Sequence, residues 1–326
     1  MKFTPPPFRP HLLVRGGHAQ TIIGAYLPHP ARTAQTKQHR IVLEDGDQLV
    51  LHEDTPDAWT AGSRVVLQIH GLGGSHESPY MQRLAARLLE RGVRNFRLDL
   101  RGYGAGYALA KHPGHAGRSE DAAAALRQIA TLCPSSPVTA IGYSLGGNIT
   151  LKLLGEVGEH PPGGLDRAIA VCPPIDLSRC SENIKNGLNK VYDRTFVRSL
   201  MTLVNRRRRE LPHFAEEALL SPAPRTLQEF DDRYTAIKSG FSGAVEYYAR
   251  CSSLPLLTNI RVPTLIIAAA DDPLIPASIF ANLSASSAVQ LHIAPSGGHL
   301  GFIGRSGADP DRRWLDWRLL ELILES

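Results

Sequence analysis

Long apolar runs are missing from this sequence of 326 residues. No stretch reaches the roughly 18 uninterrupted apolar residues that a transmembrane helix needs, so we expect no such helix. The first residues, MKFTPPPFRPHLL, are rich in proline and lack the apolar segment of a secretory signal. Membrane-spanning and secreted proteins are therefore not the expected classes.

Cysteine is also scarce, with only Cys133, Cys172, Cys180 and Cys251 in the chain. No two of them have the CxxC spacing of a zinc site or a redox motif, so we expect no metal. Reduced, mostly buried thiols are the expected state. Together with the missing signal, this pattern favours the cytoplasm.

The excess of positive charge is small, +5 at neutral pH for the whole chain. Much of it could lie in one run, Arg206 to Arg209. A solvated helix end is the expected role of this run, and peripheral contact with anionic lipid or an acidic partner is the alternative. No nucleic-acid-binding motif accompanies it, so we expect no nucleic-acid partner.

What the chain does contain is a regular alternation of strand and helix patterns. Two polar–apolar alternating segments, 41–44 and 48–53, flank Asp45-Gly46 and predict a hairpin. Further strands are expected at 65–69, 95–100, 138–143, 168–172, 264–270 and 289–293, and helices at 80–90, 120–131, 145–155, 277–283 and 313–324. Such alternation predicts an α/β fold with a mostly parallel sheet and helices on both faces.

The alternation divides the chain into three parts. Residues 1–38 lack a clear period and predict an extended N-terminal arm. Residues 39–174 and 251–326 form the expected sheet domain. Between them, residues 175–250 contain only helical patterns, at 197–204 and 243–250, and several prolines, so this segment is interpreted as an inserted helical cap.

The segment Gly142–Gly146 matches the pattern GxSxG. It follows an apolar strand and opens a helix, which is the context of a nucleophile elbow that lifts a serine hydroxyl out of the sheet. Side chains at the two glycine positions would collide with the neighbouring strand and helix. We therefore expect Ser144 to be a nucleophile, and a serine hydroxyl needs a base to take its proton.

In this fold the acid and then the histidine follow the serine along the chain. His299 lies in a glycine-rich loop directly after the last expected strand and is the expected base. Asp271 and Asp272 both end the strand before it. We choose Asp272 because Pro273 follows it and fixes its backbone direction, whereas Asp271 is expected to accept hydrogen bonds from loop N–H groups or to face solvent.

An oxyanion hole requires two backbone N–H donors. One is expected from Leu145, directly after the nucleophile. The other is expected from Leu72, in the glycine-rich loop His70–Gly74 that follows the strand 65–69. His70 itself is expected to support this loop through hydrogen bonds.

With these segments placed, the chain resembles the YheT-like branch of the α/β-hydrolase superfamily. The resemblance rests on Arg15–Ile22, His70–Gly74, Gly142–Asn148, Asp271–Pro273 and Gly297–Phe302. It implies hydrolysis of short- to medium-chain acyl esters, or acyl transfer to an alcohol, with no cofactor. His18 and Gln20, in the first of these segments, are expected to hold the arm on the sheet domain.

The expected function is therefore that of a serine esterase acting on a small-molecule acyl ester. The expected cap offers apolar side chains that could set acyl specificity, namely Phe196, Leu200, Leu203, Phe241 and Tyr247. A peptidase or thioesterase on the same fold is the enzymatic alternative. The alternative from another class is a catalytically silent ligand-binding protein.

Overall fold

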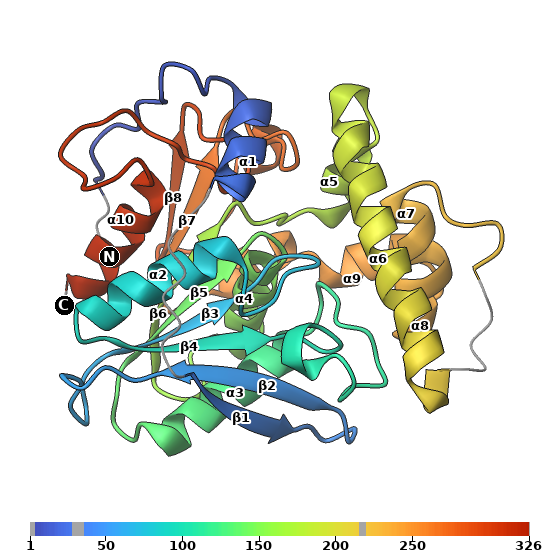
Figure 1. Ribbon diagram of the computed structural model, residues 1–326, viewed down its shortest axis with the longest axis horizontal. Helices are drawn as coiled ribbons and strands as arrows, with labels where there is room; N and C mark the ends of the chain where they lie inside the picture. The colour runs from blue at the N-terminus through green and yellow to red at the C-terminus, as the bar shows by residue number, and fades with distance from the viewer. Residues whose placement is uncertain (1–3, 28–35, 215–219, 326) are drawn as a thin grey trace.

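An eight-stranded sheet organises the molecule in the computed structural model, which describes residues 4–27, 36–214 and 220–325. The strand order is β1-β2-β4-β3-β5-β6-β7-β8 (Figure 1). Strand β2 runs antiparallel to both of its neighbours, β1 and β4, and every other neighbouring pair is parallel. The strands are β1 Lys37–Val42, β2 Gln48–Asp54, β3 Val65–Ile69, β4 Arg94–Asp99, β5 Val138–Tyr143, β6 Leu165–Val171, β7 Thr264–Ala269 and β8 Val289–Ala294. The expected α/β-hydrolase fold, with its mostly parallel sheet, is confirmed.

Helices cover both faces of the sheet because its central strands are apolar on both sides. Alternate residues of β3 show this: Val66 packs with the helices α2 and α10, while Leu67 packs with α3 and α4 on the opposite face. These helices are α2 Pro79–Glu90, α3 Ser119–Leu132, α4 Leu145–Val157 and α10 Trp314–Leu324. The two buried layers hold the strand ends, and hence the site, in fixed positions.

The N-terminal arm differs from the extended segment that was expected, because it contains the helix α1, Gly17–Tyr26. Its buried face lacks apolar side chains, which hid the helical period. A Cβ on Gly17 would overlap the Asp271 carbonyl oxygen, and one on Gly24 would come within 2.6 Å of Gly301. Between them, Gln20 is fully buried and bonds the backbone of Ile303, accepting its N–H at 2.7 Å. Glycine and glutamine thus let α1 lie directly on the loops after β7 and β8.

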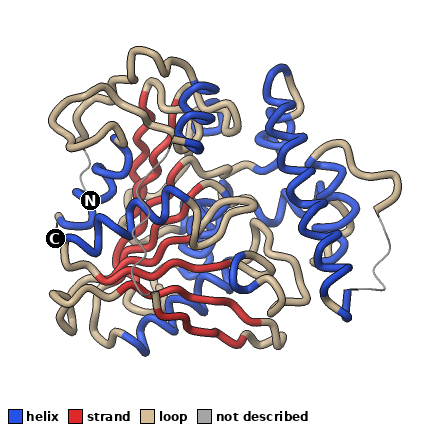
Figure 2. The backbone as a smooth tube through the Cα atoms, viewed as in Figure 1, coloured by secondary structure: helices blue, strands red, loops and turns tan. Residues whose placement is uncertain are grey.

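Only helices and loops are described between β6 and β7, as the sequence predicted for the segment 175–250 (Figure 2). They are α5 Leu177–Ile184, α6 Lys190–Glu210, α7 Leu227–Phe230, a π-helical turn Asp231–Thr235, α8 Ala236–Lys238 and α9 Ala244–Cys251. In Figure 1, α6, α7 and α8 project to one side of the sheet. The expected helix at 277–283 is only a short 3₁₀ turn, Ala277–Phe280, because the backbone becomes extended at Ala281.

Shorter 3₁₀ turns connect the remaining elements. They are Gly104–Gly106, Gly187–Asn189, Pro212–Phe214 and Leu254–Asn259. The first of them follows β4, and its Gly104 has a positive φ of 52°. A Cβ there would also overlap the carboxylate of Asp99, so glycine suits this position on both counts.

Candidate active site

Ser144 stands on a sharp turn between β5 and α4. Its backbone has φ 51° and ψ −118°, a conformation that residues with side chains rarely adopt. The neighbouring glycines make the turn possible, because a Cβ on Gly142 would overlap the carbonyl of Gly146 and one on Gly146 would overlap the carbonyl of Ile69. The GxSxG pattern therefore has a steric cause here, and the turn presents the serine hydroxyl at the strand end.

His299 connects the serine to a carboxylate from another strand end. Its Nε2 lies 2.9 Å from Ser144 Oγ, and its Nδ1 lies 2.8 Å from Asp272 Oδ2. Because an ionised carboxylate only accepts hydrogen bonds, Nδ1 carries the proton and Nε2 is left to accept from the serine hydroxyl. The other oxygen of Asp272 accepts the backbone N–H groups of Leu274 and Ile275, at 2.8 and 3.0 Å. The carboxylate is therefore fixed in direction.

Asp271 takes a different place from Asp272. Its Oδ1 accepts the backbone N–H of Gly298 at 2.8 Å, so it braces the loop that carries His299 rather than the imidazole. The N–H of His299 itself donates to Thr21 Oγ1 at 2.8 Å. Sequence reasoning gave Thr21 no role, although Thr21 lies in the Arg15–Ile22 segment that carries the family resemblance.

A neighbouring cysteine lies close to the same carboxylate. The sulfur of Cys172 lies within 4.8 Å of one carboxylate oxygen of Asp272 and of one ring nitrogen of His299. Burial, with the nearby Asp272 charge adding to it, raises the pKa of this thiol well above its ordinary value. Cys172 therefore stays protonated, and the group bonded to the histidine Nε2 is Ser144.

The loop after β3 passes directly beside the serine. A Cβ on Gly71 would lie 3.1 Å from Ser144 Cβ, and the next residue, Leu72, lines the same cavity as Ser144 and Leu145. His70 holds this loop: its Nε2 accepts the N–H of Leu100 at 3.1 Å, and its Nδ1 donates to the Gly71 carbonyl at 2.7 Å. Because burial lowers the pKa of His70, the ring stays neutral, as this bonding requires.

A cavity opens above Ser144 between the sheet domain and the helices that follow β6. The cavity volume is about 120 Å³, and the cavity opens to solvent at its mouth. Of the five side chains expected to line it, Phe196, Leu200, Leu203 and Tyr247 do so. Phe241 is absent from the lining. Its ring packs behind Tyr247, with centroids 5.5 Å apart, so the expected contact with substrate is wrong for this residue.

The cavity has further lining residues that sequence reasoning missed. The apolar ones include Leu177, Ile184, Val204, Leu227, Phe230, Leu274 and Ile275, and the polar ones include Arg101, Tyr103, Arg207, Asp231 and Tyr234. The helical period of α6 could have indicated Val204 and Arg207, which follow Leu200 by four and seven residues and share its face.

Arg207 also corrects the expectation for the run Arg206 to Arg209. Arg206 is exposed and pairs with Glu210, as a solvated helix end would. Arg207 is only 3% exposed, and its guanidinium stacks on Phe214 at 4.0 Å and donates to the Ala110 carbonyl. Four consecutive residues of an α-helix span most of its circumference, so one of them must face the protein.

His18 joins α1 to α6 in the segment 175–250, rather than to the sheet domain as expected. Its Nδ1 lies 3.0 Å from the hydroxyl of Tyr192, and the two rings are parallel with centroids 5.7 Å apart. Gln20 attaches the arm to the sheet domain, as expected, by donating to the carbonyls of Val14 and Ile303 at 2.6 and 3.1 Å.

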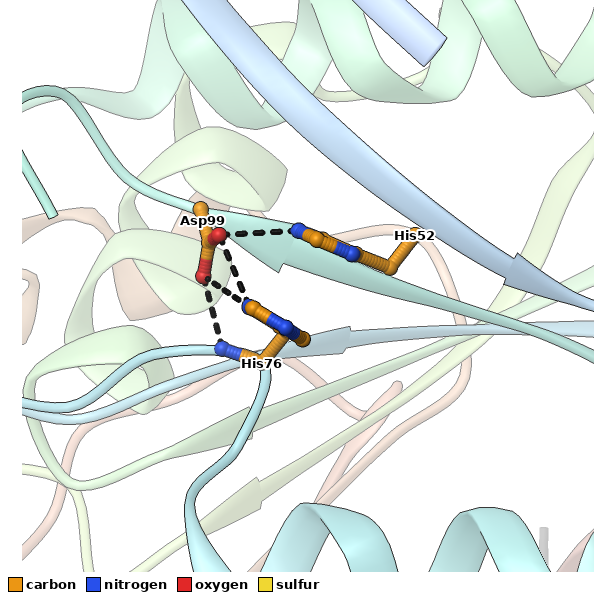
Figure 3. A group of neighbouring side chains, drawn as sticks. All are labelled: His52, His76 and Asp99. Carbon is orange, nitrogen blue, oxygen red and sulfur yellow. Dashed lines mark hydrogen bonds and ion pairs between the residues drawn. The ribbon is translucent and has the colours of Figure 1, made fainter. Parts of the chain in front are cut away.

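A second histidine–aspartate group lies in the sheet domain (Figure 3). His52 Nε2 and His76 Nδ1 both donate to Asp99 Oδ2 at 2.9 Å, and the two imidazoles are stacked with centroids 3.4 Å apart and planes 9° from parallel. A metal ion must lie near the plane of each imidazole that binds it. Two stacked, parallel rings have no such point in common, so this arrangement does not fit an ion. It instead ties the loop after β3 to the ends of β2 and β4.

Comparison with known proteins agrees with this geometry. The model of the family described as alpha/beta hydrolase fold matches residues 64–306, which is most of the chain. The chain is 33% identical to the Escherichia coli protein named "Putative esterase YheT" over 86% of this chain and 82% of that protein. The chain therefore belongs to the α/β-hydrolase family, within its YheT-like branch.

More distant relatives extend this comparison. The human protein named phospholipase ABHD3 is 25% identical over 88% of this chain and 71% of its own length. The solved structure of the esterase Pf2001 from Pyrococcus furiosus covers 99% of this chain and 96% of its own, with a TM-score of 0.55 and 16% identity, which shows the shared fold. Over residues 4–27, 36–214 and 220–325, no helix is both long and apolar enough to cross a membrane.

Proposed function

We propose that this hydrolase is a serine esterase that acts through an acyl-enzyme. The observation that carries the proposal is the 2.9 Å distance between His299 Nε2 and Ser144 Oγ, with Asp272 on the other side of the imidazole. In the proposed first step Ser144 Oγ attacks the ester carbonyl carbon while His299 Nε2 takes the serine proton. Asp272 keeps the proton on Nδ1 and stabilises the imidazolium that forms.

The carbonyl oxygen becomes an oxyanion during this step and needs donors in a dry site. The proposed donors are the backbone N–H groups of Leu72 and Leu145, which flank Ser144 in the cavity. When the tetrahedral intermediate collapses, the bond to the alcohol breaks and His299 Nε2 gives its proton to the departing oxygen. Water then resolves the acyl-enzyme by the same steps in reverse, and a second alcohol in its place would give acyl transfer.

The proposed substrate is a small ester with a short- to medium-chain acyl group. The lining of the cavity supports this, because aliphatic and aromatic side chains form most of its wall. The helices from α5 to α9 supply most of these side chains, and we accordingly treat residues 175–250 as a cap that sets acyl specificity. The relatives named as esterase and phospholipase support ester substrates of this kind.

Two further proposals concern the setting of the protein. The four cysteines are free and buried, which suits a reducing compartment, and we propose the cytoplasm.

The exposed side chains of Arg206 and Arg209, near the end of α6, suit peripheral contact with anionic lipid. Sedimentation with vesicles of anionic and of zwitterionic lipid would test the second proposal, since binding to the anionic vesicles alone is expected.

Covalent labelling tests the proposed chemistry directly. A fluorophosphonate should label the folded protein once, and peptide mass spectrometry should place the adduct on Ser144. The labelled protein should hydrolyse no ester, whereas an unlabelled sample should act on a panel of 4-nitrophenyl esters in preference to peptide or thioester analogues. A folded protein that takes no label would instead be the catalytically silent binding protein. Labelling with faster thioester or peptide turnover would favour the enzymatic alternatives.

A further inference from the structure

One carboxyl group in the cavity wall has no part in the proposed chemistry. Asp231 is 8% exposed and lines the same cavity as Ser144. It begins the π-helical turn Asp231–Thr235, and Tyr234 and Thr235 of this turn also line the cavity. π-Helical turns are rare and frequently lie at functional sites, so this irregular turn in the cavity wall requires an explanation.

The partners of Asp231 are hydroxyl groups. Tyr248, on α9, donates its hydroxyl to Asp231 Oδ2 at 2.8 Å, and the Thr235 hydroxyl also bonds the carboxylate. Among the residues that the structure describes, no lysine, arginine or histidine nitrogen forms an ion pair with it. Arg207, on α6, lines the same cavity, and its guanidinium contacts the ring of Phe214 and the Ala110 carbonyl. A buried carboxylate without a cation is costly, unless a ligand supplies the charge.

Aromatic rings surround this carboxylate on several elements. Phe230 and Tyr234 pack with centroids 5.3 Å apart, and Tyr247 and Tyr248 with centroids 5.2 Å apart. Tyr103, in the loop after β4, also lines the cavity, and its pKa is raised by burial, to which the nearby Asp231 charge adds. Aromatic faces around an acidic group are the common chemistry of sites for ammonium groups, which are attracted by both.

We propose that Asp231, with Tyr103, Tyr234 and Tyr248, forms a subsite for a positively charged group, an alkylammonium, on the substrate ester. The proposal rests on the proposed esterase function and specifies its substrate class. Esters that carry an ammonium group should bind better than neutral esters of the same shape. A purely structural Asp231 would only tie the π-helical turn to α9, and it would give no such preference.

The pH dependence of this preference has a definite sign. Burial raises the pKa of Asp231 to about 6, and the hydroxyl groups of Thr235 and Tyr248 oppose the rise. The other charged or titratable side chains that line this cavity include Arg101, Arg207, His115, Tyr103 and Tyr247. Burial raises the pKa of Tyr103 and Tyr247 and lowers the pKa of His115, so these three side chains stay neutral in this range. Asp231 is therefore ionised above about pH 6, and the preference for the cationic ester should be present at pH 8 and lost as the pH falls through 6.

Two pairs of isosteric esters test the subsite. One pair is choline butyrate and 3,3-dimethylbutyl butyrate, with the charge on the alcohol. The other is the 4-nitrophenyl esters of 4-(trimethylammonio)butanoate and 5,5-dimethylhexanoate, with the charge on the acyl group. At pH 8, kcat/KM for the cationic member of at least one pair should exceed that of its neutral isostere by about tenfold or more, mainly through a lower KM.

Variants assign the preference to Asp231. Asp231→Asn keeps a hydrogen-bond acceptor for Tyr248 and should reduce the cationic-to-neutral ratio to that of the wild type at pH 5. Asp232→Asn is the matched control, because it removes the same charge from the adjacent, exposed residue and an asparagine can still cap Ala244 N–H. It should leave both activity and ratio unchanged. Tyr248→Phe should keep the ratio at pH 8 but shift its onset to higher pH, because the charged carboxylate loses a donor.

A ratio near one in the wild type for both pairs would overturn the subsite, as would an unchanged ratio in folded Asp231→Asn. An equal loss in Asp232→Asn would also overturn it. These results differ from a failure of the esterase proposal, in which the wild type would hydrolyse neither the cationic nor the neutral esters. The ratio is taken within one protein, so a variant with less folded material still gives an answer.

Discussion

Two clusters combine histidine with aspartate but differ in function: the His299 cluster, which is His299, Asp272 and Ser144, and the His52 cluster, which is His52, His76 and Asp99. In each, an imidazole donates to a buried aspartate at 2.8–2.9 Å, and backbone N–H groups fix the carboxylate. The two clusters differ in what contacts the second ring nitrogen and the face of the imidazole. The free nitrogen of His299 meets a serine hydroxyl beside a cavity, whereas the ring of His52 is 1% exposed and its face is covered by His76.

This difference teaches that a histidine–aspartate pair is not by itself a sign of catalysis. The aspartate orients the ring and holds one proton in both clusters. Proton transfer to a substrate additionally needs a free Nε2, a nucleophile within hydrogen-bond distance and a space for the reacting group. Among the described residues no serine or other nucleophile bonds an imidazole of the cluster around Asp99, and neither His52 nor His76 lines the cavity over Ser144. This cluster instead connects the loop after β3 to the sheet. Mutations should therefore reduce chemistry in one cluster and stability in the other.

The largest loss of ester turnover is expected at Ser144, because the His299 cluster has a nucleophile and the His52 cluster does not. Ser144→Ala should reduce ester turnover by a factor of about 10³–10⁶, because only binding and the oxyanion donors remain. The thermal midpoint should change little, since the hydroxyl is at the cavity surface. Turnover of a 4-nitrophenyl ester and a thermal melt would be measured on the same sample. Near-normal turnover by the folded variant would remove Ser144 from the proposed mechanism.

Exchanging the two adjacent aspartates tests which carboxylate belongs to the catalytic pair. Asp272→Asn should lose about 10²–10⁴ in turnover, because the amide can donate to Nδ1 and so favour the wrong tautomer of His299. Asp271→Asn is the matched control, since it changes the neighbouring residue in the same way. Its effect should be far smaller, because an amide oxygen can still accept the Gly298 N–H. If Asp271→Asn were the more damaged enzyme, the acid would be assigned to the wrong residue.

The same substitution in both clusters should give opposite outcomes. His299→Gln removes the base and should nearly abolish turnover with little change in stability. His52→Gln should cost about 1–3 kcal/mol of unfolding free energy by weakening a buried hydrogen bond to Asp99, while the folded fraction turns over substrate within a few-fold of the wild type. Urea unfolding and turnover per fluorophosphonate-reactive site would be compared. A stable His52→Gln protein with strongly impaired turnover would contradict the structural role of this cluster.

The sheet and the elbow could be predicted from sequence because their physics is local. Strands such as β5 are apolar on both faces and short, and the glycines at 142 and 146 are demanded by contacts with adjacent segments. The positions of Asp272 and His299 followed from chain order and from the strand ends that carry them. These are patterns in which neighbouring residues decide the structure, and the fold that they predicted is confirmed.

The parts that could not be predicted depend on contacts between distant segments. Helix α1 was missed because it packs Gly17, Gln20 and Gly24 against loops more than 250 residues away, and no apolar period records that contact. Arg207 was expected in solvent because arginine is rarely buried. Its guanidinium is nevertheless buried, donating to the Ala110 carbonyl and stacking on the ring of Phe214. Helices around a cavity also direct apolar side chains both into the cavity and into the packing behind it, and sequence alone does not separate the two.

Phe196 and Phe241 differ in just this way, and they carry the smallest predicted effect. Both are phenylalanines of the helical segment after β6, but Phe196 lines the cavity and Phe241 packs behind Tyr247 and beside His115, at 5.8 Å between ring centroids. Phe196→Ala should widen the cavity and move the preferred acyl chain to a greater length. Each added methylene that finds an apolar contact is worth about 0.8 kcal/mol, or about fourfold in kcat/KM.

Phe241→Ala is the matched control, which should lower the thermal midpoint and leave the chain-length profile as it is. The measurement is kcat/KM for 4-nitrophenyl esters from acetate to decanoate in both variants. If the two profiles shifted alike, the wall of the cavity would not set acyl specificity, and the cap proposed over Ser144 would lose its main support.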